Sequence, residues 1–464
     1  MINPKQPITD PTFGACLRWD EEADVVIVGT GFSGLAAAIA ALDAGVKVVV
    51  LEKARSPGGN SIISGGGANA VDPRRQAPQG VYDSIDLHFK QTFEGGDCLA
   101  DPGKVRYFVE NALEGCINYL ENLMMEWSSR VSRGFGSLHE RTHSILRYRE
   151  WRKGAAIVHA LLDQIEERRQ PILLEHKVTR IIREKPLEGR VLGVEVEAAG
   201  AKKLFRARRA VVLASGGFAA NLEWVAKHDR RLADLGTTNR PTATGECIKM
   251  AQDIGADTVH MDYIQTVPGK VRPPLKAMLI VIESEEMREA SPWSRAYRIF
   301  INKEGKRFVD EGARRDVISR AAFSQEVFEP LPDIEAATIE ELEEKLGIAK
   351  RNLIETVHNY NSYCDAKEDP EFGKDANILV PVRTPPFKTE SRALMAHHTM
   401  GGLRTKGTSG KVMDRWGNVI PGLYAAGEIT GGTHGSNRLG NNATSECIVM
   451  GTLCGRNAAT ESPQ

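Results

Sequence analysis

Apolar residues gather in short, continuous runs, and several of these runs lead straight into glycine. Runs at 25–28 and 46–51 flank an alanine-rich stretch at 35–44, so the pattern predicts a strand, a helix and a second strand. A similar run at 210–214 ends at paired glycines, and another at 422–428 ends at a glycine and an acid. Short apolar strands joined by helices are typical of a buried parallel sheet. The pattern therefore predicts an α/β fold.

Further elements follow from the helical spacing of apolar positions and from turn residues. Four other segments are predicted as helices: 104–126, 155–167, 339–360 and 443–458. Residues 178–196 are predicted to form a β-hairpin that turns at Leu187-Glu188-Gly189, and 414–418 a second hairpin-type turn. Between about 261 and 394 the chain has longer polar stretches and more proline, which indicates a separate domain.

The glycine-rich segment Gly29-Thr30-Gly31-Phe32-Ser33-Gly34 lies between the first predicted strand and the first helix. Its first glycine permits a tight turn, its second lets a pyrophosphate lie against bare backbone, and its third lets the helix pack close to the strand. The helix N-terminus adds amide donors and a positive dipole. Glu52, at the end of the second strand, can accept hydrogen bonds from ribose hydroxyls. Together these features predict a dinucleotide site, and the alternative is a glycine turn that binds no ligand.

A second glycine-rich stretch follows Glu52 and Lys53 and indicates which dinucleotide binds. It contains Gly58-Gly59-Asn60-Ser61 and Ser64-Gly65-Gly66-Gly67, and it resembles the FAD-binding start of the fumarate reductase/succinate dehydrogenase flavoprotein family. The strand at 210–214 with Ser215-Gly216-Gly217 resembles the second cofactor strand of that family. The resemblance implies FAD rather than NAD. It also implies non-covalent binding, because Asn60-Ser61 stands where membrane-complex relatives attach flavin to a histidine.

The resemblance covers most of the chain from about residue 24 and implies a Rossmann-like FAD-binding domain with an inserted α+β capping domain. We expect a lead-in at 1–22, the FAD-binding domain at 23–258 and 395–464, and the capping domain at 259–394. The length of 464 residues also exceeds what one hydrophobic core usually supports. The residues expected to contact FAD are Gly29, Gly31, Phe32, Ser33, Gly34, Glu52, Lys53, Gly59, Asn60, Ser61, Gly65, Gly66, Val178, Ala214, Ser215, Gly216, Gly427, Glu428, Arg438 and Ala443.

Charge and cysteine content narrow the choice of partners. Sixty Lys and Arg against 61 Asp and Glu give a net charge of −1, so neither nucleic acid nor an anionic membrane surface is an expected partner. No apolar run approaches about 18 residues, so no membrane span is expected. Seven dispersed cysteines without a CxxC pair suit the cytoplasm and provide no ligand set for a c-type haem or an iron–sulfur cluster, and no metal site is expected. The flavin is therefore expected to exchange electrons with an external donor or acceptor.

Three loop segments combine glycine with histidine or arginine, at 307–316, 397–402 and 434–442. Glycine suits loops where backbone approaches a ligand. An arginine and a histidine that converge can hold a carboxylate, since guanidinium offers two parallel donors. The residues alone thus indicate an anion site beside the flavin. The basic segment at 131–153 permits two interpretations, a solvated basic face or a lining that touches FAD phosphates or an acidic substrate.

The same loops resemble motifs of soluble fumarate reductases, and this resemblance implies individual roles. His398 and Arg438 match the pair that holds one substrate carboxylate. Arg315 matches the arginine that protonates the substrate carbon opposite the hydride from flavin N5, and Glu428 matches the acid at the ribityl chain. Because the pKa of arginine exceeds about 12, Arg315 can act as an acid only within a relay that reprotonates it.

Two departures from the fumarate reductase pattern concern the second substrate carboxylate. Val267 stands where those enzymes have a histidine. Their short Thr-Glu-x-x-Arg segment is replaced by a longer stretch at 269–298 that contains Pro273-Pro274, although Arg295 falls near the position of the arginine. A buried carboxylate without partners would cost several kcal/mol. We therefore expect fumarate to be a poor substrate and expect a larger unsaturated acid with an apolar or aromatic far end.

Three functions remain open at this point. The first is an FAD-dependent reductase of a C=C bond conjugated to a carboxylate. The second is the reverse reaction, a desaturase of a carboxylic acid or a ketosteroid-like substrate. The third is a non-catalytic flavin electron-transfer subunit, against which the presence of Arg315, His398 and Arg438 together argues.

Overall fold

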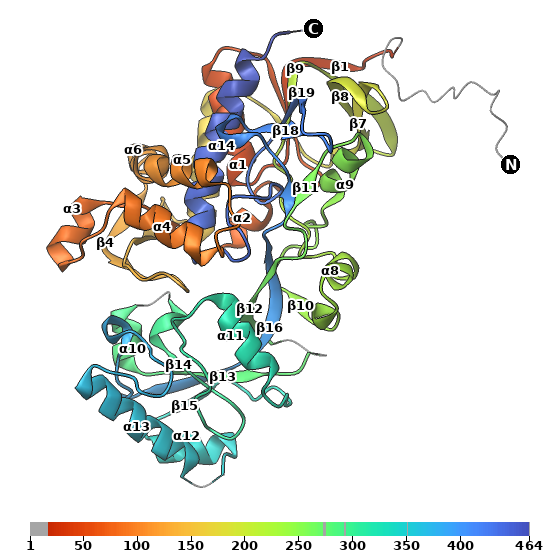
Figure 1. The fold of residues 1–464 in the computed structure, drawn as a ribbon. Coiled ribbons are helices and arrows are strands. Elements are labelled where there is room, and N and C mark those ends of the chain that lie inside the picture. The colour runs from red at the N-terminus through yellow and green to blue at the C-terminus, as the bar shows by residue number, and fades with distance from the viewer. Residues whose placement is uncertain (1–16, 272–274, 292–293, 350, 464) are drawn as a thin grey trace, which may run out of the picture.

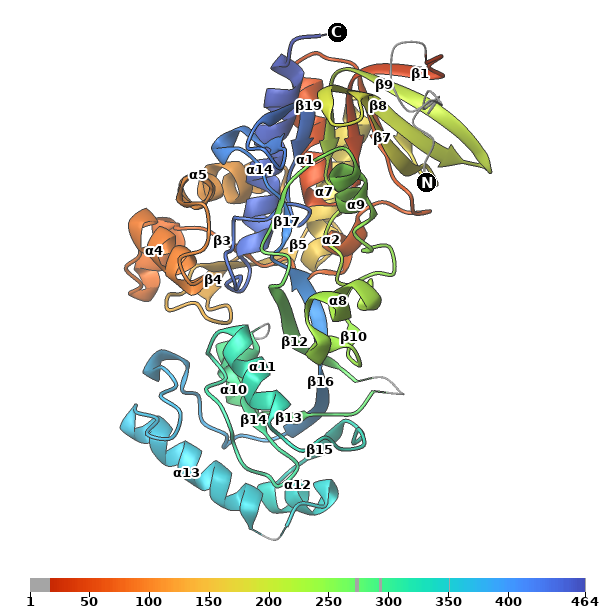
Figure 2. The same cartoon turned by 45° about the vertical axis from the view of Figure 1, so that its right-hand side comes forward.

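A computed structural model describes residues 17–271, 275–291, 294–349 and 351–463 of the chain (Figure 1). Most of the expected lead-in, Cys16 and the Pro273-Pro274 pair lie outside these residues. The remainder forms two lobes, of which the larger contains both described ends of the chain (Figures 1 and 2). None of the helices that the structure describes combines the length and the apolar character needed to cross a lipid bilayer.

The larger lobe is built on a mostly parallel sheet with the strand order β18-β19-β9-β1-β2-β6. Neighbours along this path pair in parallel except β18 and β19, and a β7–β8 hairpin continues the sheet from β9. The α/β fold class that the sequence predicts is confirmed. The strands of this sheet are β1 (Glu21–Val28), β2 (Val48–Leu51), β6 (Ile172–Leu173), β7 (Lys177–Lys185), β8 (Glu188–Ala198), β9 (Ala201–Leu213), β18 (Lys411–Met413) and β19 (Val419–Ala425).

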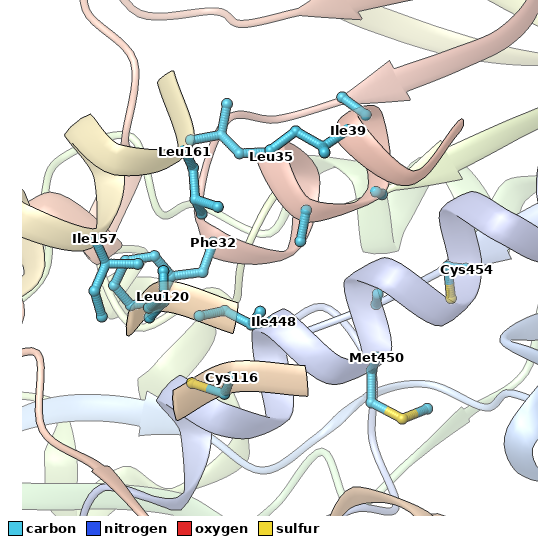
Figure 3. Close-up of a cluster of buried hydrophobic side chains, with 14 of the residues drawn as sticks. Phe32, Leu35, Ile39, Cys116, Leu120, Ile157, Leu161, Ile448, Met450 and Cys454 are labelled. Carbon is cyan, nitrogen blue, oxygen red and sulfur yellow. The ribbon is translucent and has the colours of Figure 1, made fainter. Parts of the chain in front are cut away.

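Helices α1 (Phe32–Asp43), α7 (Lys153–Glu167) and α14 (Asn442–Thr460) pack together beside this sheet. Their apolar side chains form one buried cluster, in which Phe32 of α1 lies near Ile448 of α14 and Leu35 of α1 lies beside Leu161 of α7 (Figure 3). Glycine lets α1 and α14 approach closely, since a Cβ on Gly455 would lie 2.1 Å from the Ala37 carbonyl oxygen. This close packing fixes the N-terminus of α1, which begins directly after the glycine turn.

The smaller lobe contains a second sheet with the order β10-β16-β13-β14, to which β12 and β15 also pair along β16. Strands β12 and β16 run from this lobe into the larger one (Figures 1 and 2). The elements are β10 (Gly236–Thr237), β12 (Ile264–Lys270), β13 (Leu279–Glu283), α10 (Glu285–Ala290), β14 (Ile299–Ile301), α11 (Arg315–Phe323), β15 (Ile334–Ala336), α12 (Ile339–Leu346), α13 (Asn352–Ala366) and β16 (Phe387–Thr399). Because β16 crosses the expected boundary at residue 394, the exact division into domains stays a prediction.

Smaller elements complete the described chain. The helices are α2 (Gly59–Ile63), α3 (Pro73–Gln76), α4 (Ile85–Gly95), α5 (Pro102–Ala112), η2 (Leu113–Asn118), α6 (Tyr119–Asn122), α8 (Leu222–His228) and α9 (Glu246–Asp253). The remaining strands are β3 (Ala68–Asn69), β4 (Glu126–Ser132), β5 (Thr142–Arg147), β11 (Thr258–Val259) and β17 (Gly402–Leu403). Short 3-10 turns occur at Ala77–Gln79, Arg230–Leu232, Arg295–Tyr297, Ala376–Ile378 and Gly407–Ser409.

Two segments predicted as single helices are each interrupted in the structure. The segment 104–126 is not one helix, because a π-helical turn (η2) interrupts it and Met124 has a left-handed φ of 68° before β4 begins. The segment 339–360 divides into α12 and α13, because Gly347 ends α12 with a φ of 65°. Apolar periodicity continued through both breaks, whereas the breaks depend on the backbone angles of single residues.

Candidate active site

The turn between β1 and α1 can be closed only by glycine. Gly29 has a φ of 106°, and a Cβ there would lie 2.5 Å from the carbonyl oxygen of Ala214 on the neighbouring strand loop. A Cβ on Gly34 would lie 2.0 Å from the Gly29 carbonyl oxygen. The first glycine of the motif therefore permits the turn and the third lets the helix pack close to the strand, as the spacing predicts.

The N-terminus of α1 offers backbone donors to an anion. Its N-cap, Gly31, has no side chain to cap the helix, and the first turn carries no acidic residue. The amide of Phe32 donates to Oγ of Ser61 at 3.0 Å. A twelve-residue helix of this kind carries a positive dipole at its N-terminus, so this end of α1 suits a phosphate group.

Glu52 is held in place at the end of β2. The amides of Thr30 and Ala54 donate to its carboxylate at 3.2 and 2.9 Å, and the Thr30 hydroxyl donates as well. Lys53 instead pairs with Glu246 at 2.5 Å and donates to Thr244 at 3.0 Å. Both side chains line a cleft of about 120 Å³ at the carboxyl ends of β1, β2 and β9.

A larger cavity of about 510 Å³ adjoins this cleft. Five residues line both spaces, namely Phe32, Asn60, Ser61, Glu428 and Cys447. The larger cavity is also lined by β12, β16 and α11, which lie where the two lobes meet (Figures 1 and 2). An elongated ligand in the cleft can thus reach a second molecule in the cavity.

The expected cofactor residues distribute over the two spaces. Those that line the smaller cleft are Gly29, Gly31, Phe32, Ser33, Glu52, Lys53, Gly59, Asn60, Ser61, Val178, Ala214, Ser215, Gly216 and Glu428. Those that line the larger cavity alone are Gly65, Gly66, Arg438 and Ala443. Gly34 and Gly427 line neither space, and a Cβ on Gly427 would lie 2.2 Å from Oγ of Ser33.

Arg315, His398 and Arg438 all line the larger cavity and are buried. Three of their nitrogens have no hydrogen-bond partner within the described part of the chain, namely Nε of Arg315, Nδ1 of His398 and Nε of Arg438. Unsatisfied buried donors are rare in folded proteins and indicate a missing ligand or water. The three side chains therefore bring unpartnered nitrogens to one cavity, although they come from α11, β16 and the loop before α14.

Gln265 on β12 holds two of these groups together. Nη1 of Arg315 donates to its Oε1 at 2.7 Å, and its Nε2 donates to the Arg438 carbonyl oxygen at 2.8 Å. His398 is the register partner of Gln265 on the adjacent strand. The sheet of the smaller lobe thus positions all three cavity residues through a single glutamine.

Burial sets the charge of each group. It holds the pKa of His398 well below its usual value, and the charge of Arg438 lowers it further, so this histidine is neutral. Burial lowers the pKa of Arg438 to about 10, which leaves the guanidinium charged at neutral pH. Burial raises the pKa of Glu428, whose Oε1 accepts from the Thr399 amide at 3.0 Å. The cavity therefore presents a cation and a neutral imidazole to a bound anion.

The basic segment at 131–153 contains both buried and exposed basic residues. Arg141 is fully buried and donates twice to Asp83, at 2.9 and 2.7 Å, and Arg133 pairs with Glu140 at 2.7 Å. Lys153 is the one charged residue of this segment that lines the larger cavity, among the residues that the structure describes. These two pairs are structural, whereas Arg147, Arg149 and Arg152 are exposed, as the interpretation of a solvated face expects.

Sequence reasoning missed several lining residues. In the cleft these are Thr30, His176, Thr242, Ala243, Gly245 and Glu246, and in the cavity they include Thr238, Asn239, Lys270 and Arg392. Arg392 and His398 both lie on β16, but the register shifts between them, so the alternation of a strand would not have shown that both line the cavity.

Comparisons with known proteins agree with this geometry. Residues 24–444 match the family model of an FAD binding domain. The urocanate reductase of Eggerthella lenta is 33% identical over 94% of this chain and 75% of its own length. A solved flavocytochrome c3 fumarate reductase in an open conformation superposes with a TM-score of 0.72, at 30% identity, over 95% of this chain and 78% of that one. The chain belongs to the fumarate reductase/succinate dehydrogenase flavoprotein family.

Membership in this flavoprotein family makes FAD the cofactor and confirms the FAD-binding domain with its capping domain. The glycine turn, the uncapped α1 N-terminus and the fixed Glu52 carboxylate fit FAD in the cleft. The NADH:acrylate oxidoreductase of Vibrio harveyi is 31% identical over 95% of this chain, which spans only 50% of that relative's length.

Proposed function

We propose that this flavoprotein reduces a C=C bond conjugated to a carboxylate. The observation that carries the proposal is the position of His398, Arg438 and Arg315 on a cavity that adjoins the FAD cleft. The family relatives act on acids of this kind, as the names urocanate reductase and NADH:acrylate oxidoreductase state. Bound reduced FAD supplies the hydride for such a reaction.

The residues of the chain bind and protonate the acid. Arg438 offers charged donors and His398 a neutral imidazole to the carboxylate, which draws electron density from the conjugated double bond. Arg315 faces the same cavity and gives a proton to the substrate carbon. Burial holds the pKa of Arg315 well below its usual value, and the charge of Arg438 lowers it further, which makes proton donation easier.

Fumarate is a poor substrate in this proposal. Val267 lines the cavity with a buried apolar side chain. It stands at the position where the resemblance to fumarate reductases implies a histidine. A second carboxylate next to Val267 would lose its hydration without gaining a partner.

The electron donor or acceptor is proposed to be external, because the dispersed cysteines provide no ligand spacing for an iron–sulfur relay. We propose non-covalent FAD, since Asn60 and Ser61 line the cleft where a histidine attachment site would stand. The cytoplasm stays our proposed location, and the six cysteines in the described residues are free thiols.

The test uses enzyme driven by reduced methyl viologen and a panel of unsaturated acids, with loss of the conjugated double bond as the readout. Oxidation of the dye by an unsaturated monocarboxylate, with fumarate slower by about 10-fold or more, supports the proposal. Fumarate as the fastest acid would contradict the argument from Val267.

The reverse reaction is the second candidate, because the same groups lower the barrier in both directions. The observation that favours it is the position of His398, Arg438 and Arg315 on one cavity, since a carboxylate site there would hold a saturated acid as well as an unsaturated one. The reverse reaction is tested by adding saturated acids and an artificial electron acceptor to the oxidised enzyme, with flavin absorbance as the readout. Bleaching by a saturated acid, with no reduction of any unsaturated one, would make the protein a desaturase.

A further inference from the structure

The cavity that holds the proposed carboxylate site has a second cationic wall. Arg295 and Arg392 line it together with His398 and Arg438. Arg392 and His398 both lie on β16, six positions apart, which places their Cα atoms about 20 Å from each other at the usual rise of a strand. The second wall is therefore well separated from the first.

Arg392 is only partly neutralised. Its side chain is 6% exposed, and its Nε has no partner within the described residues. One terminal nitrogen pairs with Glu390, a half-exposed side chain on the same strand. The charge of the neighbouring Arg295 is, after burial, the next cause of its lowered pKa, which is about 10.

Arg295 lacks a close counter-charge. Its guanidinium makes no hydrogen bond or ion pair in the part of the chain that the structure describes. The nearest acid acting on it is Glu283, which already pairs with Arg298 at 2.6 Å and with Arg288 at 3.4 Å. Two neighbouring guanidinium groups thus share one cavity wall without a carboxylate between them.

The lining of the cavity is unbalanced in charge. Its described cationic residues are Lys153, Lys270, Arg295, Arg315, Arg392 and Arg438, whereas Glu428 is its one acidic residue among those described. Lys270 is paired with Asp333 at 2.9 Å, so it adds little. Like charges gathered in a partly buried cavity repel one another unless an anion joins them.

We propose that Arg295 and Arg392 form a second anion site, which binds an anionic group at the far end of the substrate. The substrate class is then an elongated unsaturated acid with two anionic ends. This inference rests on the proposed function for its conjugated end. It replaces the expected apolar or aromatic far end, because the wall opposite the first carboxylate carries guanidinium groups.

An elongated dianion also accounts for Val267. Val267 is the register partner of Met395, which lies between Arg392 and His398 on β16, so the short second carboxylate of fumarate meets an apolar side chain. A longer chain passes Val267 with methylene groups and places its second charge at Arg392. Apolar contact in the middle and cations at both ends distinguish this cavity from a site for a four-carbon diacid.

The experiment measures binding of saturated acids to the oxidised FAD-loaded enzyme by isothermal titration calorimetry, with flavin absorbance as a second readout. The probes are matched pairs of equal length, namely hexanoate and adipate, octanoate and suberate, and decanoate and sebacate. A phosphonate-ended octanoate distinguishes a carboxylate from a phosphate-like far end. We expect at least one diacid to bind about 10- to 100-fold more tightly than its monoacid, the range of one or two charge-assisted hydrogen bonds.

Variants test whether Arg295 and Arg392 cause the preference for diacids over monoacids. Arg392→Gln and Arg295→Gln should each remove about 10-fold or more of the diacid preference and change monoacid binding by less than about 2-fold. Arg392→Lys should restore part of it. Arg320→Gln, which changes an exposed arginine of α11, is the matched control and should change neither. FAD content and thermal unfolding show whether each variant is folded, and Arg295→Gln serves if Arg392→Gln is not.

Diacids that bind no more tightly than monoacids at any length would overturn the proposal. Equal weakening of both acids in Arg392→Gln would also overturn it, because a structural arginine paired with Glu390 predicts that result. Saturated acids need no turnover, so a diacid preference without C=C reduction would refute the reductase alone. Reduction of monoacids only, without a diacid preference, would refute the second site alone.

Discussion

Arg438 and His398 contribute to carboxylate binding in different ways, because burial lowers both pKa values but leaves only Arg438 charged at neutral pH. Arg438 has a pKa of about 10, so it stays charged at neutral pH and attracts the carboxylate. His398 is held neutral and supplies directional hydrogen bonding without repelling its cationic neighbours. An anion site built this way does not depend on a histidine charge.

The affinity for a saturated monoacid should therefore stay constant between about pH 5.5 and 8.5. The bound form needs charged Arg438, which is protonated throughout this range and loses its proton only as pH rises through about 10. Calorimetric titration at several pH values provides the measurement. A loss of affinity as pH rises through about 6.5, the ordinary pKa of histidine, would mean that His398 binds as a cation.

At the scale of elements, the glycine turn and its flanking strands were predictable because the signal is local. Gly29, Gly34 and Glu52 lie within 24 residues, and each has a role that its type makes necessary. The anion site was different. His398 and Arg438 lie on separate elements 40 positions apart, and only the family resemblance linked them.

Pairings between distant elements could not be predicted at all. Arg141 is paired with Asp83 across 58 positions, and nothing in the basic segment shows that its charge is buried. Arg392 was missed because strand β16 crosses the expected domain boundary and its register against β12 is a tertiary property. Local patterns give elements, whereas register and burial decide which side chains meet.

The contact between α1 and α14 offers a test at this scale. Gly455→Ala should destabilise the protein by about 1–3 kcal/mol, because the new Cβ would lie 2.1 Å from the Ala37 carbonyl oxygen. Helix propensity alone predicts stabilisation by about 1 kcal/mol for this change. The sign of the change in unfolding free energy therefore shows whether the close helix contact outweighs helix propensity. Urea unfolding measures it. The control is Arg456→Ala at the next, exposed position of α14, which should stay within about 0.5 kcal/mol.

At the scale of the whole molecule, the two lobes contribute different parts of one site. The larger lobe provides the cleft for FAD, and the smaller lobe provides β12, α11 and most of β16 along the cavity (Figure 2). FAD binding should therefore stabilise the folded chain as a whole.

Removal of FAD should lower the unfolding temperature, and added FAD should restore it in a concentration-dependent way. Saturation at about 100 times Kd corresponds to about 2.7 kcal/mol. Gly29→Ala should abolish this effect, since its Cβ would meet the Ala214 carbonyl oxygen at 2.5 Å. Gly200→Ala is the matched control, because it has a similar positive φ of 76° but no atom within 4 Å of the new Cβ. An equal loss of FAD response in both variants would point to general backbone strain.

The central claim is that Arg315 protonates an unsaturated acid held by Arg438 and His398. The most direct measurement is single-turnover reoxidation of dithionite-reduced enzyme by an accepted unsaturated acid, followed by flavin absorbance in a stopped-flow instrument. Arg315→Ala should slow this step by about 10²- to 10⁴-fold, the usual contribution of a general acid, while the oxidised variant binds the saturated acid within a few-fold of the wild type. Reoxidation at the wild-type rate in Arg315→Ala would contradict the account.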